Sequence, residues 1–162
     1  MPNLGLSFYI FFCVSAFFAL VLSIYPIPHA YAALRPELFC LLVVYWVINY
    51  PQYFGVTTAW LMGLFLDVVH STVWGAHALG LAAVAYICLS SYQRIRSYSL
   101  WQQTLWVFVF VGIHQVIVNW MLGLSGYHKP THIILVTTAV SALSWPIMVL
   151  LFRRLRRHYR LL

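Results

Sequence analysis

Long stretches without a charged side chain constrain this sequence more than any other feature. Leu6–Tyr25, Leu100–Leu124 and Thr131–Phe152 contain no Asp, Glu, Lys or Arg. A helix of about twenty residues reaches ~30 Å, which is the thickness of a bilayer core. The chain is 64% hydrophobic and 7% charged, whereas soluble domains carry about a quarter charged residues. We therefore predict an all-α integral membrane protein, a single polytopic domain over residues 1–162 with a short basic tail at 153–162.

Two shorter apolar segments, Leu38–Tyr50 and Gly55–Val69, leave the number of spans open. They either form two spans, extended by their flanking residues, or a re-entrant hairpin that enters and leaves the membrane on one side. Tyr and Trp residues at their ends suit a membrane interface and favour two spans. With the apolar segment Ala76–Tyr92, this predicts a compact bundle of about six transmembrane helices. We expect the first run to be retained, although Ala30-Tyr31-Ala32 matches a signal-peptidase pattern, because residues 1–5 lack Lys and Arg.

Basic residues are distributed unevenly along the chain, and this predicts its orientation. Those expected on one face are Arg94, Arg96, Arg153, Arg154, Arg156, Arg157 and Arg160. Only Arg35 and Lys129 fall on the opposite face. Because Lys and Arg are enriched on the cytoplasmic side, we expect both termini in the cytoplasm of a bacterial inner membrane. The net charge of +7 then favours anionic lipid headgroups as partners and does not indicate nucleic acid.

Small residues recur every fourth position in the third apolar segment. On a helix they form one narrow stripe, which consists of Gly55, Ala59, Gly63, Asp67 and Ser71. Small side chains let another helix backbone approach closely in a bilayer. Ala76 and Gly80 have the same spacing in the next segment. We therefore expect these residues to contact protein, either within the bundle or in a partner.

Asp67 is the only acid besides Glu37, and it lies inside an apolar segment. Such residues normally face protein or water, because burying an unpaired charge is costly. Asp67 either caps or hydrogen-bonds a neighbouring helix, or it has a direct functional role. As its partner we consider Arg35, expected in the same half of the membrane, or the local donors His70 and Ser71.

The sequence contains no recognisable catalytic or metal-binding set. A hydrolase needs a nucleophile, a base and an orienting acid, and only two acids are present. His70 and His77 are seven residues apart, and no Cys or acid completes a metal site. No glycine-rich loop opens a helix as a phosphate site requires. We therefore expect no enzyme activity and no cofactor.

The order of features resembles the MreD family of rod shape-determining proteins of Gram-negative bacteria. The matching features run in order over nearly the whole chain: Arg35-Pro36, Tyr45-Trp46-Val47-Ile48, the Gly55–Asp67 stripe, Trp74-Gly75-Ala76-His77-Ala78-Leu79-Gly80, Leu100-Trp101-Gln102-Gln103, Trp145-Pro146 and a basic tail. This resemblance implies a six-helix bundle similar to the substrate-binding membrane subunits of vitamin transporters. Glu37 is a departure from the pattern that we expect of the family.

The resemblance also implies a function in cell elongation, without catalytic residues. Such a protein would bind the transmembrane helix of MreC and support rod shape and lateral peptidoglycan synthesis. It would act indirectly with MreB and with the synthase made of RodA and a class B penicillin-binding protein. The alternative function is a small-molecule-binding subunit of a transporter, which would need several polar groups converging in one pocket.

Overall fold

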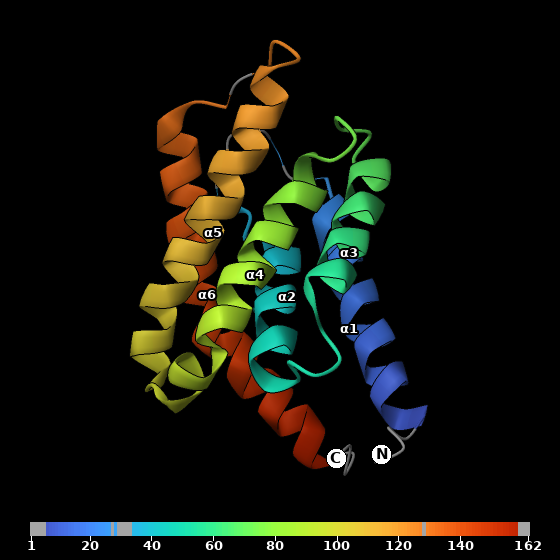
Figure 1. Cartoon of the computed structure of the whole chain (residues 1–162), viewed down its shortest axis with the longest axis vertical. Helices are drawn as coiled ribbons and strands as arrows, with labels where there is room; N and C mark the ends of the chain where they lie inside the picture. The colour runs from blue at the N-terminus through green and yellow to red at the C-terminus, as the bar shows by residue number, and fades with distance from the viewer. Residues whose placement is uncertain (1–5, 27, 29–33, 128, 159–162) are drawn as a thin grey trace.

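The computed structural model describes residues 6–26, 28, 34–127 and 129–158, and its secondary structure is helical (Figure 1). The Ala30–Ala32 pattern and Arg160 lie outside these residues. Six helices follow one another along the chain: α1 Leu6–Ile24, α2 Leu38–Asn49, α3 Val56–Val69, α4 Ala76–Ser97, α5 Leu100–Gly123 and α6 Thr131–His158. The predicted all-α bundle is therefore confirmed.

Successive helices run in alternating directions along the long axis of the bundle (Figure 1). The start of α1, the α4–α5 connection and the end of α6 lie toward one end, and the turn between α2 and α3 points toward that same end. The α3–α4 and α5–α6 connections lie at the opposite end. Arg94 and Arg96, in the last turn of α4, are thus at the same end as the basic residues that finish α6.

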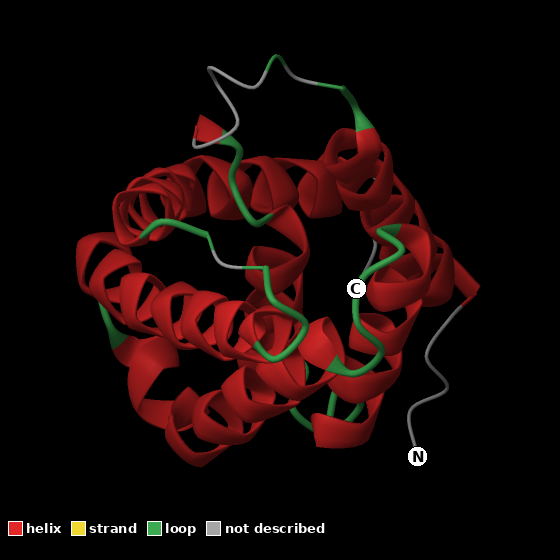
Figure 2. Cartoon of the chain, turned by 90° about the horizontal axis from the view of Figure 1, so that it is seen from above, coloured by secondary structure: helices red, strands yellow, loops and turns green. Residues whose placement is uncertain are grey.

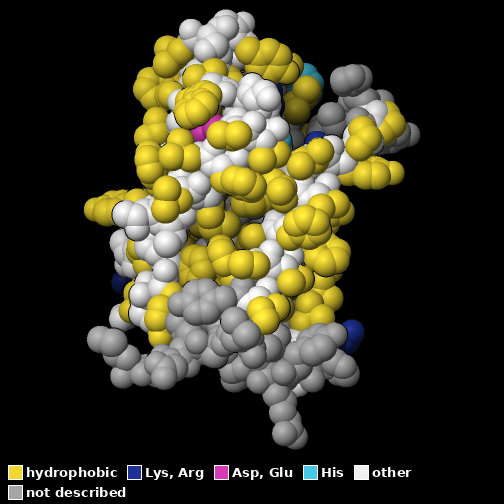
Figure 3. Space-filling model, turned by 90° about the vertical axis from the view of Figure 1, so that its right-hand side faces the viewer, with side chains coloured by type: hydrophobic (Ala, Val, Ile, Leu, Met, Phe, Trp, Pro, Cys, Tyr) yellow, Lys and Arg dark blue, Asp and Glu magenta, His cyan; other side chains and the backbone are white. Residues whose placement is uncertain are grey.

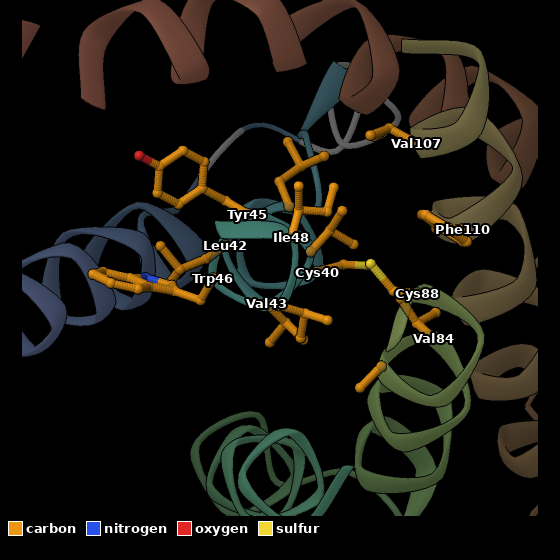
Figure 4. Packing of buried hydrophobic residues seen from close by; sticks show 14 of the residues in the cluster. Cys40, Leu42, Val43, Tyr45, Trp46, Ile48, Val84, Cys88, Val107 and Phe110 are labelled. Carbon is orange, nitrogen blue, oxygen red and sulfur yellow. The ribbon is translucent and has the colours of Figure 1, made fainter. Parts of the chain in front are cut away.

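Helix α2 lies in the centre of the bundle. It contacts α1, α4, α5 and α6, and among the outer helices α3 packs on α4, α4 on α5 and α5 on α6. Figure 2 shows the helices of the bundle packed side by side, seen from above. All residues from Phe39 to Ile48 are buried, so every face of this helix is covered by protein. A helix that is hydrophobic all round is expected at such a position. Figure 4 shows its side chains spreading toward the surrounding helices.

Aromatic rings join α1 and α6 to this central helix. Trp46 stacks on Phe54 with ring centroids 5.2 Å apart and meets Phe12 edge-on at 5.5 Å. Tyr45 meets Phe152 of α6 edge-on at 4.8 Å. Offset and edge-on aromatic pairs each add about 0.5–1.5 kcal/mol beyond the area that they bury. The aromatic contacts thus stabilise the half of the bundle that holds the start of α1 and the end of α6.

The outer surface suits a lipid environment. Hydrophobic side chains are spread over the described part of the face seen in Figure 3, and large apolar residues such as Phe17, Phe65 and Leu105 are exposed. Helices α4, α5 and α6 are each long and apolar enough to cross a membrane, and the three other helices contain shorter apolar segments. The chain is therefore a multi-pass membrane protein.

Two helices extend beyond their predicted ends. Helix α4 continues through Arg94 and Arg96 to Ser97, because Ile95 between them is fully buried and holds the last turn against the bundle. Helix α6 contains Pro146 and continues to His158, so most of the expected basic tail is helical. The C-terminal half of α6 runs obliquely across the bundle (Figure 1).

Candidate functional site at the α3–α4 junction

The Asp67 carboxylate is the centre of the densest polar cluster in the described part of the chain. Its Oδ1 accepts hydrogen bonds from the backbone N–H of His77 at 2.9 Å and from Nδ1 of the same residue at 2.8 Å. Its Oδ2 accepts from the N–H of Gly75 at 2.9 Å and of Ala78 at 3.3 Å. The hydroxyl of Thr72 donates to Oδ1 at 3.0 Å. With only 1% of its surface exposed, Asp67 thus has the donors that a buried carboxylate requires.

This arrangement makes Asp67 a cap for the following helix. The first N–H groups of a helix lack intrahelical acceptors, and the positive end of the helix dipole favours an anion there. Asp67, near the end of α3, supplies that anion to the start of α4. Gly75 is the residue before α4 and has φ of +99°, a conformation that glycine adopts without strain. The turn between the two helices therefore brings the N–H groups of α4 onto the carboxylate.

Close packing of small residues aligns α3 with α4 below this cap. A Cβ atom added to Gly63 would lie 2.6 Å from the backbone nitrogen of Ala78. Ala59 and Ala76 are also buried, with 2% and 0% exposure. Gly55 precedes the first turn of α3, and a Cβ there would meet nothing closer than 3.9 Å. The close approach thus depends on Gly63, one helical turn before Asp67.

The predicted pair of Arg35 and Asp67 is wrong. Nη2 of Arg35 donates to the carbonyl oxygen of Leu22 at 3.0 Å, and among the described residues the basic side chain that reaches Asp67 is the imidazole of His77. Arg35 was considered because it was expected at a similar depth in the membrane. The carboxylate of Asp67 instead accepts hydrogen bonds from the backbone N–H groups of Gly75, His77 and Ala78 and from Nδ1 of His77, all at the start of α4. Arg35 instead fastens the α1–α2 connection to the last turns of α1.

His70 and Ser71 are also not donors to Asp67. Nε2 of His70 lies 2.9 Å from the hydroxyl oxygen of Ser23, so His70 connects the end of α3 to α1. Burial lowers the pKa of His70, which keeps this ring neutral at pH 7. Ser71 is exposed, has φ of +51°, and its N–H donates to the carbonyl oxygen of Val68. Within the small-residue stripe, Gly63 thus packs against α4, whereas Ser71 belongs to the turn that follows α3.

Glu37, the other acid, connects the start of α2 to two outer helices. Its Oε1 accepts from Nε2 of Gln115 at 2.7 Å, and its backbone N–H donates to the hydroxyl of Ser141 at 2.9 Å. Glu37 is the N-cap residue of the central helix. Gln115 lies on α5 and Ser141 on α6, so one acidic residue connects three helices.

A third polar contact joins two of the motifs quoted above. Nε2 of Gln103 donates to the carbonyl oxygens of Ile95 at 3.2 Å and Tyr98 at 3.1 Å. Its Oε1 accepts from Nε1 of Trp145 at 3.3 Å. Gln102 caps α5 by accepting the Ser99 N–H at 3.1 Å. The Leu-Trp-Gln-Gln run thus fixes the α4–α5 connection and fastens it to α6.

Sequence reasoning assigned no polar contact to the residues that complete these clusters, namely Thr72, Gly75, His77, Gln103, Gln115 and Ser141. Gly75, the residue before α4, could have indicated the partner of Asp67. An acid shortly before a glycine turn lies close to the N–H groups at the start of the following helix. Gln115 and Ser141 lie far from Glu37 in sequence, and spacing could not connect them.

The chemistry of these clusters is structural. Asp67 and Glu37 both use their oxygens as acceptors for donors from neighbouring helices. No group of three His, Cys, Asp or Glu residues in the described ranges could hold a metal ion. Cys40 and Cys88 are buried free thiols on α2 and α4. The arrangement joins neighbouring helices through these hydrogen bonds.

Comparison with known proteins gives one consistent result. The family model of rod shape-determining protein MreD matches residues 5–155. A curated relative, the rod shape-determining protein MreD of Haemophilus influenzae, is 32% identical over 155 residues, which cover 93% of this chain and 94% of the relative. No solved structure matches the chain. The family match includes each of the three polar clusters described above.

Proposed function

Because the chain belongs to the MreD family, whose members are non-catalytic membrane proteins of rod shape determination, we propose that it binds the transmembrane helix of MreC. Membership implies a place in the elongasome, the machinery of cell elongation. In this proposal the bundle is a rigid subunit that holds MreC in the inner membrane. It acts indirectly with MreB and with the synthase of RodA and a class B penicillin-binding protein, and so supports lateral peptidoglycan synthesis.

The family match carries the proposal, because it extends over the bundle from residue 5 to residue 155. Within this bundle the two acids, Asp67 and Glu37, form hydrogen bonds between its own helices. Asp67 holds α3 to α4, and Glu37 joins α2 to α5 and α6. The exterior carries many exposed large apolar side chains, which suit lipid or a partner's helix. A rigid, apolar-surfaced bundle is the kind of subunit that holds a single-span partner.

We propose a six-span topology with both termini in the cytoplasm. The turn between α2 and α3 points toward the end that holds the start of α1, which favours two spans over a re-entrant hairpin (Figure 1). Arg94, Arg96 and the arginines of α6 gather at that end, whereas Arg35 and Lys129 belong to connections at the other. In an anionic leaflet each exposed arginine contributes about 1 kcal/mol of attraction.

The alternative, a small-molecule-binding subunit, receives less support from the polar residues. Asn49 donates to the carbonyl oxygen of Tyr45 on its own helix, and Asn119 accepts the N–H of Lys129 in the following loop. Nε2 of His70 lies at hydrogen-bond distance from the hydroxyl of Ser23. These groups are dispersed over separate helices and local bonds, while a ligand site requires them to converge.

Rescue of cell shape tests the proposed function. In cells depleted of their own MreD, expression of this chain should restore rod shape when the host MreC is compatible. The control is a chain with Asp67→Ala at matched expression, which should fail to rescue. Full rescue in cells whose MreC carries an unrelated transmembrane helix would contradict the proposal.

A further inference from the structure

His114 on α5 is buried without a partner for its ring. It is 2% exposed, and neither Nδ1 nor Nε2 has a hydrogen-bond partner among the described residues. A neutral imidazole carries one donor and one acceptor. Leaving both unpaired in the interior costs free energy, and buried polar groups in native proteins are almost always paired. This side chain therefore points to a ligand of the bundle.

The surroundings of His114 define where that ligand lies. The ring packs on α4 at Gly80, where an added Cβ would lie 2.8 Å from Cδ2 and 3.4 Å from Nε2 of His114. His77 lies one turn earlier on the same helix, and the two ring centroids are 5.8 Å apart. Gln115, the next residue on α5, donates to the carboxylate of Glu37 at 2.7 Å. The site thus lies between α4 and α5, beside the Asp67 cap.

The hydrogen-bond roles at this site follow from Asp67. Since the carboxylate accepts from Nδ1 of His77, the neutral His77 ring presents Nε2 as an acceptor. No described residue donates to that Nε2 within hydrogen-bond distance, and the two imidazoles do not bond to each other. A single oxygen that donates to His77 and accepts from the N–H of His114 would satisfy both rings. Such an oxygen belongs to a hydroxyl group or to water.

We propose that an ordered water molecule bridges Nε2 of His77 and the N–H of His114. Buried waters typically make about three hydrogen bonds to polar groups that are otherwise unpaired. This water extends the Asp67–His77 contact to α5, so that α3, α4 and α5 are joined by one hydrogen-bonded chain. The central helix below, from Phe39 to Ile48, is apolar apart from Tyr45 and Trp46.

Magnetic resonance on the intact chain tests this proposal. The full-length protein, labelled with ¹⁵N-histidine and held in lipid nanodiscs, is measured by water-edited solid-state spectroscopy, with His114→Gln and His77→Gln used for assignment. We expect polarisation transfer from water to the N–H of His114 and a ¹⁵N shift typical of an acceptor at Nε2 of His77. Absence of transfer to His114 would overturn the proposal. A bound organic molecule in the native mass spectrum would overturn the assignment to water.

The direction in which His114→Leu changes the melting temperature gives an independent test. If the imidazole of His114 were dry and unpaired, His114→Leu would raise the melting temperature in detergent, because it removes an unpaired polar group. With the bridge present, the same change breaks it and should lower the melting temperature by about 2–4 °C. His132→Leu, at an exposed histidine, is the control and should leave the value unchanged. If His114→Leu does not fold, the spectrum of the unaltered chain still decides.

Discussion

Gly63 of α3 lies directly against the backbone of Ala78 in α4, with no room for a side chain between them. A Cβ on Gly63 would lie 2.6 Å from the nitrogen of Ala78 and 2.7 Å from the carbonyl oxygen of His77. Backbone atoms cannot rotate away as a side-chain tip can. The distance between the two helices, and with it the reach of Asp67 to the start of α4, therefore depends on this glycine.

We predict that Gly63→Ala separates α3 from α4 and lowers the yield of folded protein. Overpacking of a close contact typically costs about 1–3 kcal/mol. The matched control is Gly55→Ala on the same segment, where a Cβ meets nothing closer than 3.9 Å. Size-exclusion profiles of the two variants from the same membranes measure the effect. Equal folded yields for both variants would contradict the packing argument.

Removal of the Asp67 carboxylate should destabilise the α3–α4 junction. Asp67→Ala leaves the N–H groups of Gly75 and His77 without acceptors, at a cost of about 1–3 kcal/mol for each buried group. Asp67→Asn keeps one acceptor oxygen and should be milder. Thermal melting in detergent measures both. Arg35→Gln, which removes an exposed hydrogen bond to the carbonyl of Leu22, serves as control and should lower the melting temperature less than Asp67→Ala. An equal loss in both variants would support an Arg35–Asp67 interaction after all.

The helices of the fold could be predicted from the sequence more completely than the polar contacts between them. Uncharged runs predicted the long helices, and the turn residues between Tyr50 and Gly55 separated α2 from α3 where the structure does. The four-residue spacing placed Gly63 and Asp67 on one face, and both are buried. These features depend on local periodicity, which a single sequence contains.

The partners of the buried acids depend on tertiary structure instead. Nothing in the spacing of Glu37, Gln115 and Ser141 indicates that the central helix begins between α5 and α6. For Asp67, membrane depth suggested a distant arginine, whereas the next helix start was nearer and supplied more donors. A cap offered by the following helix is a better first hypothesis for an acid near a glycine turn than a long-range ion pair.

Gln103 and Trp145 should be energetically coupled. Gln103→Leu removes the acceptor of the indole N–H and the donor to Ile95 and Tyr98, while Trp145→Phe removes only the indole donor. A double-mutant cycle on thermal stability isolates the shared term, which we expect at about 0.5–1.5 kcal/mol. Strictly additive effects of the two changes would show that the 3.3 Å contact contributes nothing to stability.

Charge at the end of α6 should set the orientation of the chain. Replacement of Arg153, Arg154, Arg156, Arg157 and Arg160 by Gln removes five positive charges from the predicted cytoplasmic face. The bias in Lys and Arg between the two faces then disappears, because Arg94 and Arg96 remain on one face and Arg35 and Lys129 on the other, so we expect mixed topology. A reporter fused after Leu162 reads the location of the C-terminus. An extracytoplasmic signal from the unaltered chain would contradict both the orientation and the even number of spans.

Co-purification with MreC tests the proposed function most directly. The full chain is expressed with tagged MreC, extracted in mild detergent and purified through the tag, in parallel with an MreC whose transmembrane helix is replaced by an unrelated span. We predict that the chain is retained in a stable complex with native MreC and is lost when the helix is exchanged. Equal recovery with both versions, or a chain that elutes alone with a tightly held metabolite, would contradict the proposal and favour a small-molecule-binding subunit.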